Sequence, residues 1–253
     1  MKIRKKAPKP ALTKPPLYLI GYRGTAPPIE ELKAWYDLHY GGPLLGQEGS
    51  GSPTLIVRHG PWQAHIATKL PEANAAEWHR LLAWGHQALG TVAPTAVGPG
   101  IIVDTILLTA RLARGLTLLT QGTAFDLTCH DYLNPSDWQD RPLNMFMIQD
   151  HVSIRHQETE DGAADWFYTL GLTKFGLDEL ELIQPRGLPE RETIELLLSA
   201  VDEVQRGGHN PKVGQNLDLP DLAQTVRIVK HRTAAPTGQM RAFRQIADVS
   251  IEG

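Results

Sequence analysis

Two groups of side chains could carry chemistry, and the first contains histidine. His130 and Asp131 are adjacent in the sequence, and His151 lies on a later segment that is predicted to form a neighbouring strand. A tertiary cluster of these three residues could bind a metal ion or transfer protons, because imidazole and carboxylate groups serve both purposes. None of the 10 histidines forms the HxxxH or HExxH spacing of a helical zinc site. Surface or hydrogen-bonded core histidines are therefore the simpler interpretation.

The second group is the pair of carboxylates at Glu179 and Glu181. Alternate residues of a strand point to the same face, so both side chains share one face of a strand that is predicted over residues 179–183. Two neighbouring carboxylates can perform acid–base catalysis or bind a cation. An exposed sheet edge that is kept hydrated by its charges is the preferred interpretation. The sequence therefore indicates no metal and no catalytic set, and both groups remain candidates if a site assembles only in the folded chain.

Composition and motifs exclude several classes of function. A net charge of −3 is too close to balance for a globally basic nucleic-acid-binding protein. The sequence contains neither a phosphate-binding GxxxxGK[ST] loop nor the GxSxG turn of serine hydrolases, and no cofactor is predicted. The single cysteine, Cys129, excludes an internal disulfide, favours a cytoplasmic location and is predicted to be a half-buried strand residue. No apolar run reaches the roughly 18 residues of a membrane helix, so no membrane contact is predicted.

The elements that must position these residues predict an α+β fold with mainly antiparallel sheets and helices on one face. A ferredoxin-like arrangement of each half is one option within that class. In the first half, strands are predicted over residues 17–22, 54–59 and 62–70, and helices over residues 27–39 and 75–90. In the second half, strands are predicted over residues 123–130, 145–158, 165–172, 179–183 and 224–231, and helices over residues 101–121 and 189–206.

Changes in composition divide the chain. Residues 92–100 are rich in proline and glycine and are predicted to join the two halves, which pack as one globular unit. The predicted parts are a disordered basic, proline-rich tail (1–16), an N-terminal α+β half (17–96), a C-terminal α+β half (97–232) and a C-terminal tail (233–253).

Partner-binding residues are predicted in two places. The basic tail offers Lys2, Arg4, Lys5 and Lys6. Trp78 and Trp84 lie six positions apart on one predicted helix, so both cannot lie at the centre of the same buried face. One of them is therefore expected at an interface, where tryptophan is enriched.

Four segments occur in a recognisable order. They are a long helix after a Pro-Gly segment (97–119), a strand and loop (122–135), the sequence GLTKFGLDELEL (171–182), and a helix with a glycine-containing turn and closing strand (190–229). In order and spacing, about residues 78–229 resemble the uncharacterised bacterial domain-of-unknown-function family 4261. This chain has GGHNPKVGQNL where that family has a continuous glycine-rich sequence. The resemblance implies an α+β fold and brings no established reaction, ligand or catalytic residue.

These observations lead to one functional hypothesis and two alternatives. The chain is expected to be a non-enzymatic cytoplasmic bacterial protein that binds another protein, as an immunity, adaptor or assembly component; homo-oligomerisation is also open. The first alternative is an enzyme or a metal- or ligand-binding protein whose site assembles only in the tertiary structure. The second is a nucleic-acid-associated protein that uses the basic residues 1–16.

Overall fold

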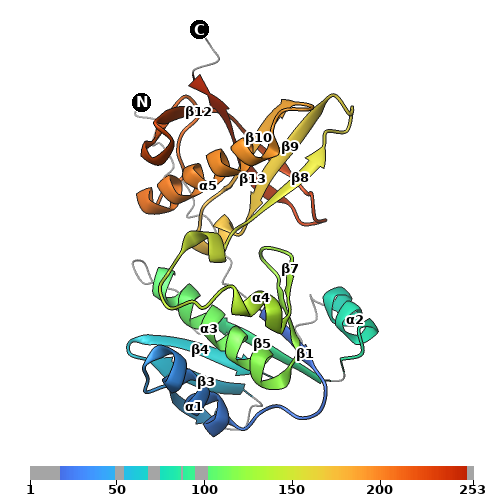
Figure 1. The fold of residues 1–253 in the computed structure, drawn as a ribbon, viewed down its shortest axis with the longest axis vertical. Coiled ribbons are helices and arrows are strands. Elements are labelled where there is room, and N and C mark those ends of the chain that lie inside the picture. Colours follow the sequence, from blue (N-terminus) through green and yellow to red (C-terminus); the bar gives the residue numbers. More distant parts are fainter. Residues whose placement is uncertain (1–17, 49–53, 68–74, 87, 95–101, 250–253) are drawn as a thin grey trace, which may run out of the picture.

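The computed structural model describes residues 18–48, 54–67, 75–86, 88–94 and 102–249. Two mainly antiparallel sheets, with helices packed against them, make up the described part of the chain (Figure 1). The predicted α+β class is therefore confirmed. Among the helices in these segments, none combines the length and apolar character that crossing a bilayer requires.

Sheet A has the strand order β2-β3-β4-β5-β1-β6-β7. Its strands are β1 (Tyr18–Tyr22), β2 (Leu45–Glu48), β3 (Thr54–His59), β4 (Trp62–Ala67), β5 (Ala88–Pro94), β6 (Thr123–Asp126) and β7 (Asp131–Leu133). The helices in the same stretch of chain are α1 (Ile29–Tyr40), α2 (Ala75–Ala83), α3 (Ile102–Thr120) and α4 (Pro135–Gln139).

The core of sheet A follows from the alternation of β1. Tyr18, Ile20 and Tyr22 belong to the buried cluster that also contains residues of α1, α3 and α4, whereas Leu19 packs on the other face with Leu81 of α2. Helix α3 lies close to α1 because Gly115 has no side chain. A Cβ at that position would lie 2.8 Å from the ring of Trp35.

Sheet B has the strand order β11-β12-β13-β10-β9-β8. Its strands are β8 (Ser153–Glu158), β9 (Ala164–Leu170), β10 (Glu179–Pro185), β11 (Asn216–Leu219), β12 (Gln224–Ala234) and β13 (Arg241–Asp248). Helix α5 (Glu190–Gly207) covers one face through an apolar stripe that meets Phe167, Leu180 and Ile246. The opposite face, which carries a small cluster around Tyr168 and Phe243, has no helix on it in the described segments.

Several predicted elements were wrong. The helix predicted to run to residue 90 ends at Ala83, and the supposed linker begins inside β5, a strand in the middle of sheet A. Residues 233–253 were predicted to be a tail, yet they contain β13, which lies between β12 and β10. The boundary predicted at residues 96–97 falls between two elements of the sheet A part, because the chain passes to sheet B after β7.

Candidate functional site

The β6–β7 hairpin belongs to sheet A, and its turn contacts residues of sheet B at the junction between the two sheets (Figure 1). Asp126, the last residue of β6, shapes this turn: its Oδ1 accepts hydrogen bonds from the backbone N–H groups of Thr128 at 2.8 Å and Cys129 at 3.0 Å. Its Oδ2 lies 2.6 Å from Nζ of Lys174, which belongs to the 3-10 turn between β9 and β10. One carboxylate thus orders the hairpin and binds sheet B.

Lys174 is fully buried at this junction. Besides Asp126, its ammonium group donates to the carbonyl of His151 at 2.9 Å and lies 3.2 Å from Sγ of Cys129. These three partners match the three donors of an ammonium group. Burial alone would lower the pKa of Lys174, but Asp126 above all raises it well above its ordinary value, so the ion pair is kept.

Glu179 holds the Lys174 turn in shape. Its carboxylate accepts hydrogen bonds from the backbone N–H groups of Gly171 at 2.9 Å and Leu172 at 3.1 Å, and from the hydroxyl of Thr169 at 2.9 Å. Arg241 lies 3.2 Å from the same carboxylate and also donates to the carbonyl of Thr128 at 2.8 Å, which ties the turn to the hairpin. Burial raises the pKa of Glu179, and these donors oppose the rise.

The histidine group is brought to the same junction. Asp131 forms an ion pair with Arg155 and accepts a hydrogen bond from the hydroxyl of Ser153. Arg155 also donates to the carbonyls of Cys129 and His130, so it clamps the hairpin turn. The ring of His130, whose φ is 57°, contacts the ring of Phe125 edge-on.

His151 is fully buried and its ring stacks parallel to Phe146 at 5.0 Å. Neither ring nitrogen has a hydrogen-bond partner within the described residues. Burial, with a contribution from Lys174, lowers the pKa of His151 to about 3, so the ring is neutral at physiological pH. Among the residues that the structure describes, no group of three or more His, Cys, Asp and Glu side chains is arranged to hold a metal ion.

The candidate carboxylates do not form an exposed edge, so that interpretation was wrong. Strand β10 is in the interior of sheet B, and Glu179 and Glu181 are both 0% exposed. The two side chains lie on the same face of β10, as the alternation of a strand predicted. Glu179 lies at the junction between the sheets, and Glu181 lies farther along the open face of sheet B. Cys129 is buried as well, in the hairpin turn rather than in a strand.

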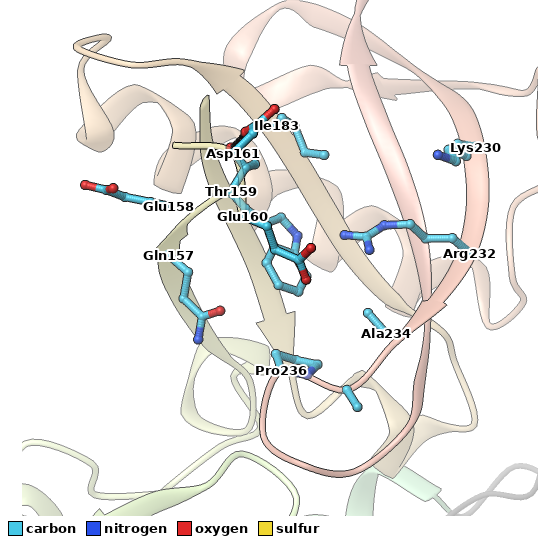
Figure 2. Close-up of a pocket in the computed structure, with 12 residues that line it drawn as sticks. Gln157, Glu158, Thr159, Glu160, Asp161, Ile183, Lys230, Arg232, Ala234 and Pro236 are labelled. Carbon is cyan, nitrogen blue, oxygen red and sulfur yellow. Dashed lines mark hydrogen bonds between the residues drawn. The ribbon is translucent and has the colours of Figure 1, made fainter. Parts of the chain in front are cut away.

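A groove of about 640 Å³ lies on the open face of sheet B, opposite α5 (Figure 2). Its floor is formed by Trp166, Ile183 and Arg232, and one wall is the turn between β8 and β9. The other wall follows the end of β12. The remaining lining residues are Gln157, Glu158, Thr159, Glu160, Asp161, Lys230, Ala234, Ala235 and Pro236.

Glu181 fixes the floor of this groove. Its carboxylate accepts two hydrogen bonds from the Arg232 guanidinium, at 2.7 and 2.6 Å, and one from the indole N–H of Trp166 at 2.8 Å. The guanidinium lies over the Trp166 ring with 4.9 Å between the guanidinium carbon and the ring centroid. This bidentate geometry holds both side chains in one orientation, so the floor is a rigid, flat surface.

Charges of both signs rim the groove. Lys230 lies on the same strand as Arg232, is exposed, and has no ion pair within the described segments. On the opposite wall Glu158 is paired with Arg186 at 2.6 Å, whereas Glu160 is exposed and has no ion pair in the part of the chain that is described. Figure 2 shows Arg232 and Glu160 extending into the groove from opposite sides. One wall thus offers a cation and the other an anion.

Of the residues predicted to bind a partner, the structure describes only the side chain of Trp84. Lys2, Arg4, Lys5 and Lys6 fall outside the described residues, as does the side chain of Trp78. Trp84 is 50% exposed beside α2, and its ring meets the ring of Tyr132 at 4.4 Å.

Sequence reasoning missed the residues that organise both regions. Lys174 is the one charged residue between Gly171 and Gly176, in a segment that also contains Leu172 and Phe175, and its position there could have indicated a structural role. Arg232 and Trp166 carried no such signal, because they lie far apart in the sequence and on different strands. Comparison of the chain with protein-family models, curated proteins and solved structures found no match.

Proposed function

We propose that this chain is a non-enzymatic protein that binds another protein, and that the groove on the open face of sheet B receives the partner. One observation carries the proposal: the groove combines the half-buried Trp166 and the exposed Ile183 with charges of both signs on its walls. Aromatic and arginine side chains inside a polar rim are the composition that protein interfaces favour.

The charges on the walls define the partner segment that fits. Lys230 favours a carboxylate of the partner, and Glu160 favours a basic side chain. Glu181 neutralises Arg232, so the stacked Arg232 and Trp166 side chains mainly provide a flat surface for an apolar or aromatic side chain. The expected segment therefore carries an acidic and a basic residue on either side of an apolar one.

A protein partner fits these walls better than a nucleic acid does. A polyanion that approached Lys230 would also meet the carboxylates of Glu158, Glu160 and Asp161 across the groove. The candidate catalytic carboxylates are consistent with a binding role, because Glu179 and Glu181 accept hydrogen bonds that order the sheet face. The proposal includes a cytoplasmic role as an immunity, adaptor or assembly component. The single cysteine, Cys129, supports it, because a chain with one cysteine forms no internal disulfide.

Affinity purification from the native organism, at the native expression level, tests this function. Wild type and Lys230→Glu are compared with Lys212→Glu, which reverses an exposed lysine outside the groove. Mass spectrometry of the eluted proteins and small molecules is expected to find a stoichiometric protein partner with wild type and Lys212→Glu, and to lose it with Lys230→Glu.

Two results would contradict the proposal. The first is that no reproducible partner is recovered or crosslinked. The second is that Lys230→Glu retains the partner as well as wild type does. A lone protein that carries a metal ion or a metabolite would instead favour the ligand-binding alternative.

A further inference from the structure

Strands β10 and β13 are neighbours in sheet B over only part of their lengths. They run parallel and pair from Glu179 opposite Phe243 to Glu181 opposite Gln245. Beyond these positions β10 continues to Pro185 and pairs with β9, while β13 continues to Asp248 and pairs with β12. The two strands therefore separate toward the end of the sheet that points away from sheet A, where they leave a notch between residues 182–185 and 246–248.

The notch is a cavity of about 420 Å³ that is closed on one side by the start of α5. Leu188, Leu196 and Ile246 give it an apolar lining, and Leu188 is 49% exposed. An apolar group that covers Leu188 would remove apolar surface from water, and this burial favours binding.

The backbone edges of the notch are open. Within the described residues, no strand pairs with the side of residues 182–185 that faces β13, or with the side of residues 246–247 that faces β10. Exposed strand edges present rows of N–H and C=O groups that another strand can pair with. Because β10 and β13 are parallel, a strand that runs antiparallel to one runs antiparallel to both.

Gln184 provides an independent sign of a missing partner. It is 7% exposed and lines the notch, and its side-chain oxygen accepts a hydrogen bond from the hydroxyl of Thr193. Its Nε2 is buried and has no acceptor within the described residues. Buried amide donors nearly always have a hydrogen-bond acceptor, so we expect a partner to bring an acceptor into the notch.

We infer that the notch binds an extended segment of a partner protein, which inserts as a strand between β10 and β13. Its backbone pairs with both open edges, and one of its carbonyl oxygens accepts a hydrogen bond from Nε2 of Gln184. An apolar side chain enters the pocket of Leu188, and a basic side chain lies near Glu192, whose exposed carboxylate sits at the rim. This site is separate from the groove and neither site requires the other, although Ile183 lines both.

Selection of random nine-residue peptides displayed on phage tests the inference. Recovered sequences are expected to alternate apolar and polar residues and to include a lysine or arginine. Synthetic copies are then measured by fluorescence polarisation against wild type, Leu188→Asp and Leu38→Asp; Leu38 is 82% exposed on α1 and serves as the matched control. Leu188→Asp is expected to weaken binding by about tenfold or more, and Leu38→Asp to leave it unchanged.

Two further measurements separate this site from the groove. Gln184→Met removes the unpartnered donor and is expected to lower the affinity for the peptides. Lys230→Glu is expected to bind the peptides with the affinity of wild type. Bound peptide is expected to slow amide hydrogen exchange at residues 182–184 and 246–247. Failure to select any peptide, equal affinity for Leu188→Asp and wild type, or protection confined to other strands would overturn the inference.

Discussion

Nζ of Lys174 lies 2.6 Å from Oδ2 of Asp126, so two residues that are 48 positions apart join the two sheets through a buried ion pair. Both side chains are almost fully enclosed. Ion pairs of this kind are directional, and apolar contacts are not. The seating of the β6–β7 hairpin against sheet B is therefore expected to depend on this pair and on the hydrogen bonds around it.

Replacement of Lys174 by Met is expected to lower the free energy of unfolding by about 3–5 kcal/mol, because it leaves the Asp126 carboxylate buried without its counter-charge. Urea unfolding monitored by circular dichroism measures the change. The double variant Lys174→Met/Asp126→Asn is expected to recover part of the loss, since it removes the uncompensated charge. Arg191→Ala, which breaks an exposed pair with Glu195, serves as the control and is expected to cost less than about 1 kcal/mol. A loss of that small size for Lys174→Met would show that the buried pair is not a determinant of stability.

Gly171 is expected to tolerate no side chain. Its φ is 126°, and a Cβ there would lie 2.4 Å from the carbonyl oxygen of His151 and 2.8 Å from Sγ of Cys129. Gly171→Ala combines backbone strain with this overlap and should destabilise the protein by more than about 3 kcal/mol. Gly162→Ala is the matched control: its φ is 67° with nothing within 4 Å, so about 1–2 kcal/mol of strain is expected. If thermal unfolding showed equal losses of stability for the two variants, the atoms around Gly171 would have moved apart without a free-energy cost.

Local patterns were sufficient to predict part of this fold. The apolar spacing of α5 and the glycines that follow it predicted that helix to within a residue at each end, and Gly208 adopts the left-handed conformation of a helix cap. The Gly60-Pro61 turn likewise predicted the β3–β4 hairpin. In these elements the pairing partner is close in sequence, so the signal is local.

The errors arose where tertiary pairing overrides local composition. β5 contains Gly90 and ends at Pro94, so it has the composition of a loop, and it becomes a strand because β1 and β4 pair with it on both sides. The groove depends on Trp166, Glu181 and Arg232, which come from three different strands. No spacing within the sequence indicates that these side chains meet.

His151 is expected to make the protein sensitive to acid. Its pKa is about 3 in the folded chain and 6.5 in a free histidine, so below pH 6.5 the unfolded chain binds a proton that the folded chain does not. Stability is therefore retained above pH 6.5 and falls as the pH decreases toward 3, by about 2 kcal/mol at pH 5 from this residue alone. Urea unfolding at pH 7 and pH 5 measures the slope. Burial also lowers the pKa of His65 and His86, so these two residues add to the loss of stability at low pH.

The variant His151→Phe isolates that contribution, because a phenyl ring can keep the stacking on Phe146 and cannot titrate. The difference in unfolding free energy between pH 7 and pH 5 should shrink by about 2 kcal/mol relative to wild type. The variant should also be at least as stable at pH 7, since both unpartnered ring nitrogens are removed. An unchanged difference would show that folding does not lower the pKa of His151.

Cys129 reports on opening of the junction between the sheets. Its thiol is buried, donates to the carbonyl of His151 at 3.1 Å, and has its pKa raised by burial to about 12. At pH 8 only about one thiol in 10⁴ is then ionised, so reaction with a disulfide reagent such as DTNB should be slow until the hairpin leaves sheet B. Lys174→Met should speed the reaction, because the open form becomes more populated when the ion pair is lost. Because Cys129 is the single cysteine, the absorbance change reports this site alone. Labelling of the native protein at the rate of the urea-unfolded chain would mean that the turn opens freely and that the junction contacts do not hold it.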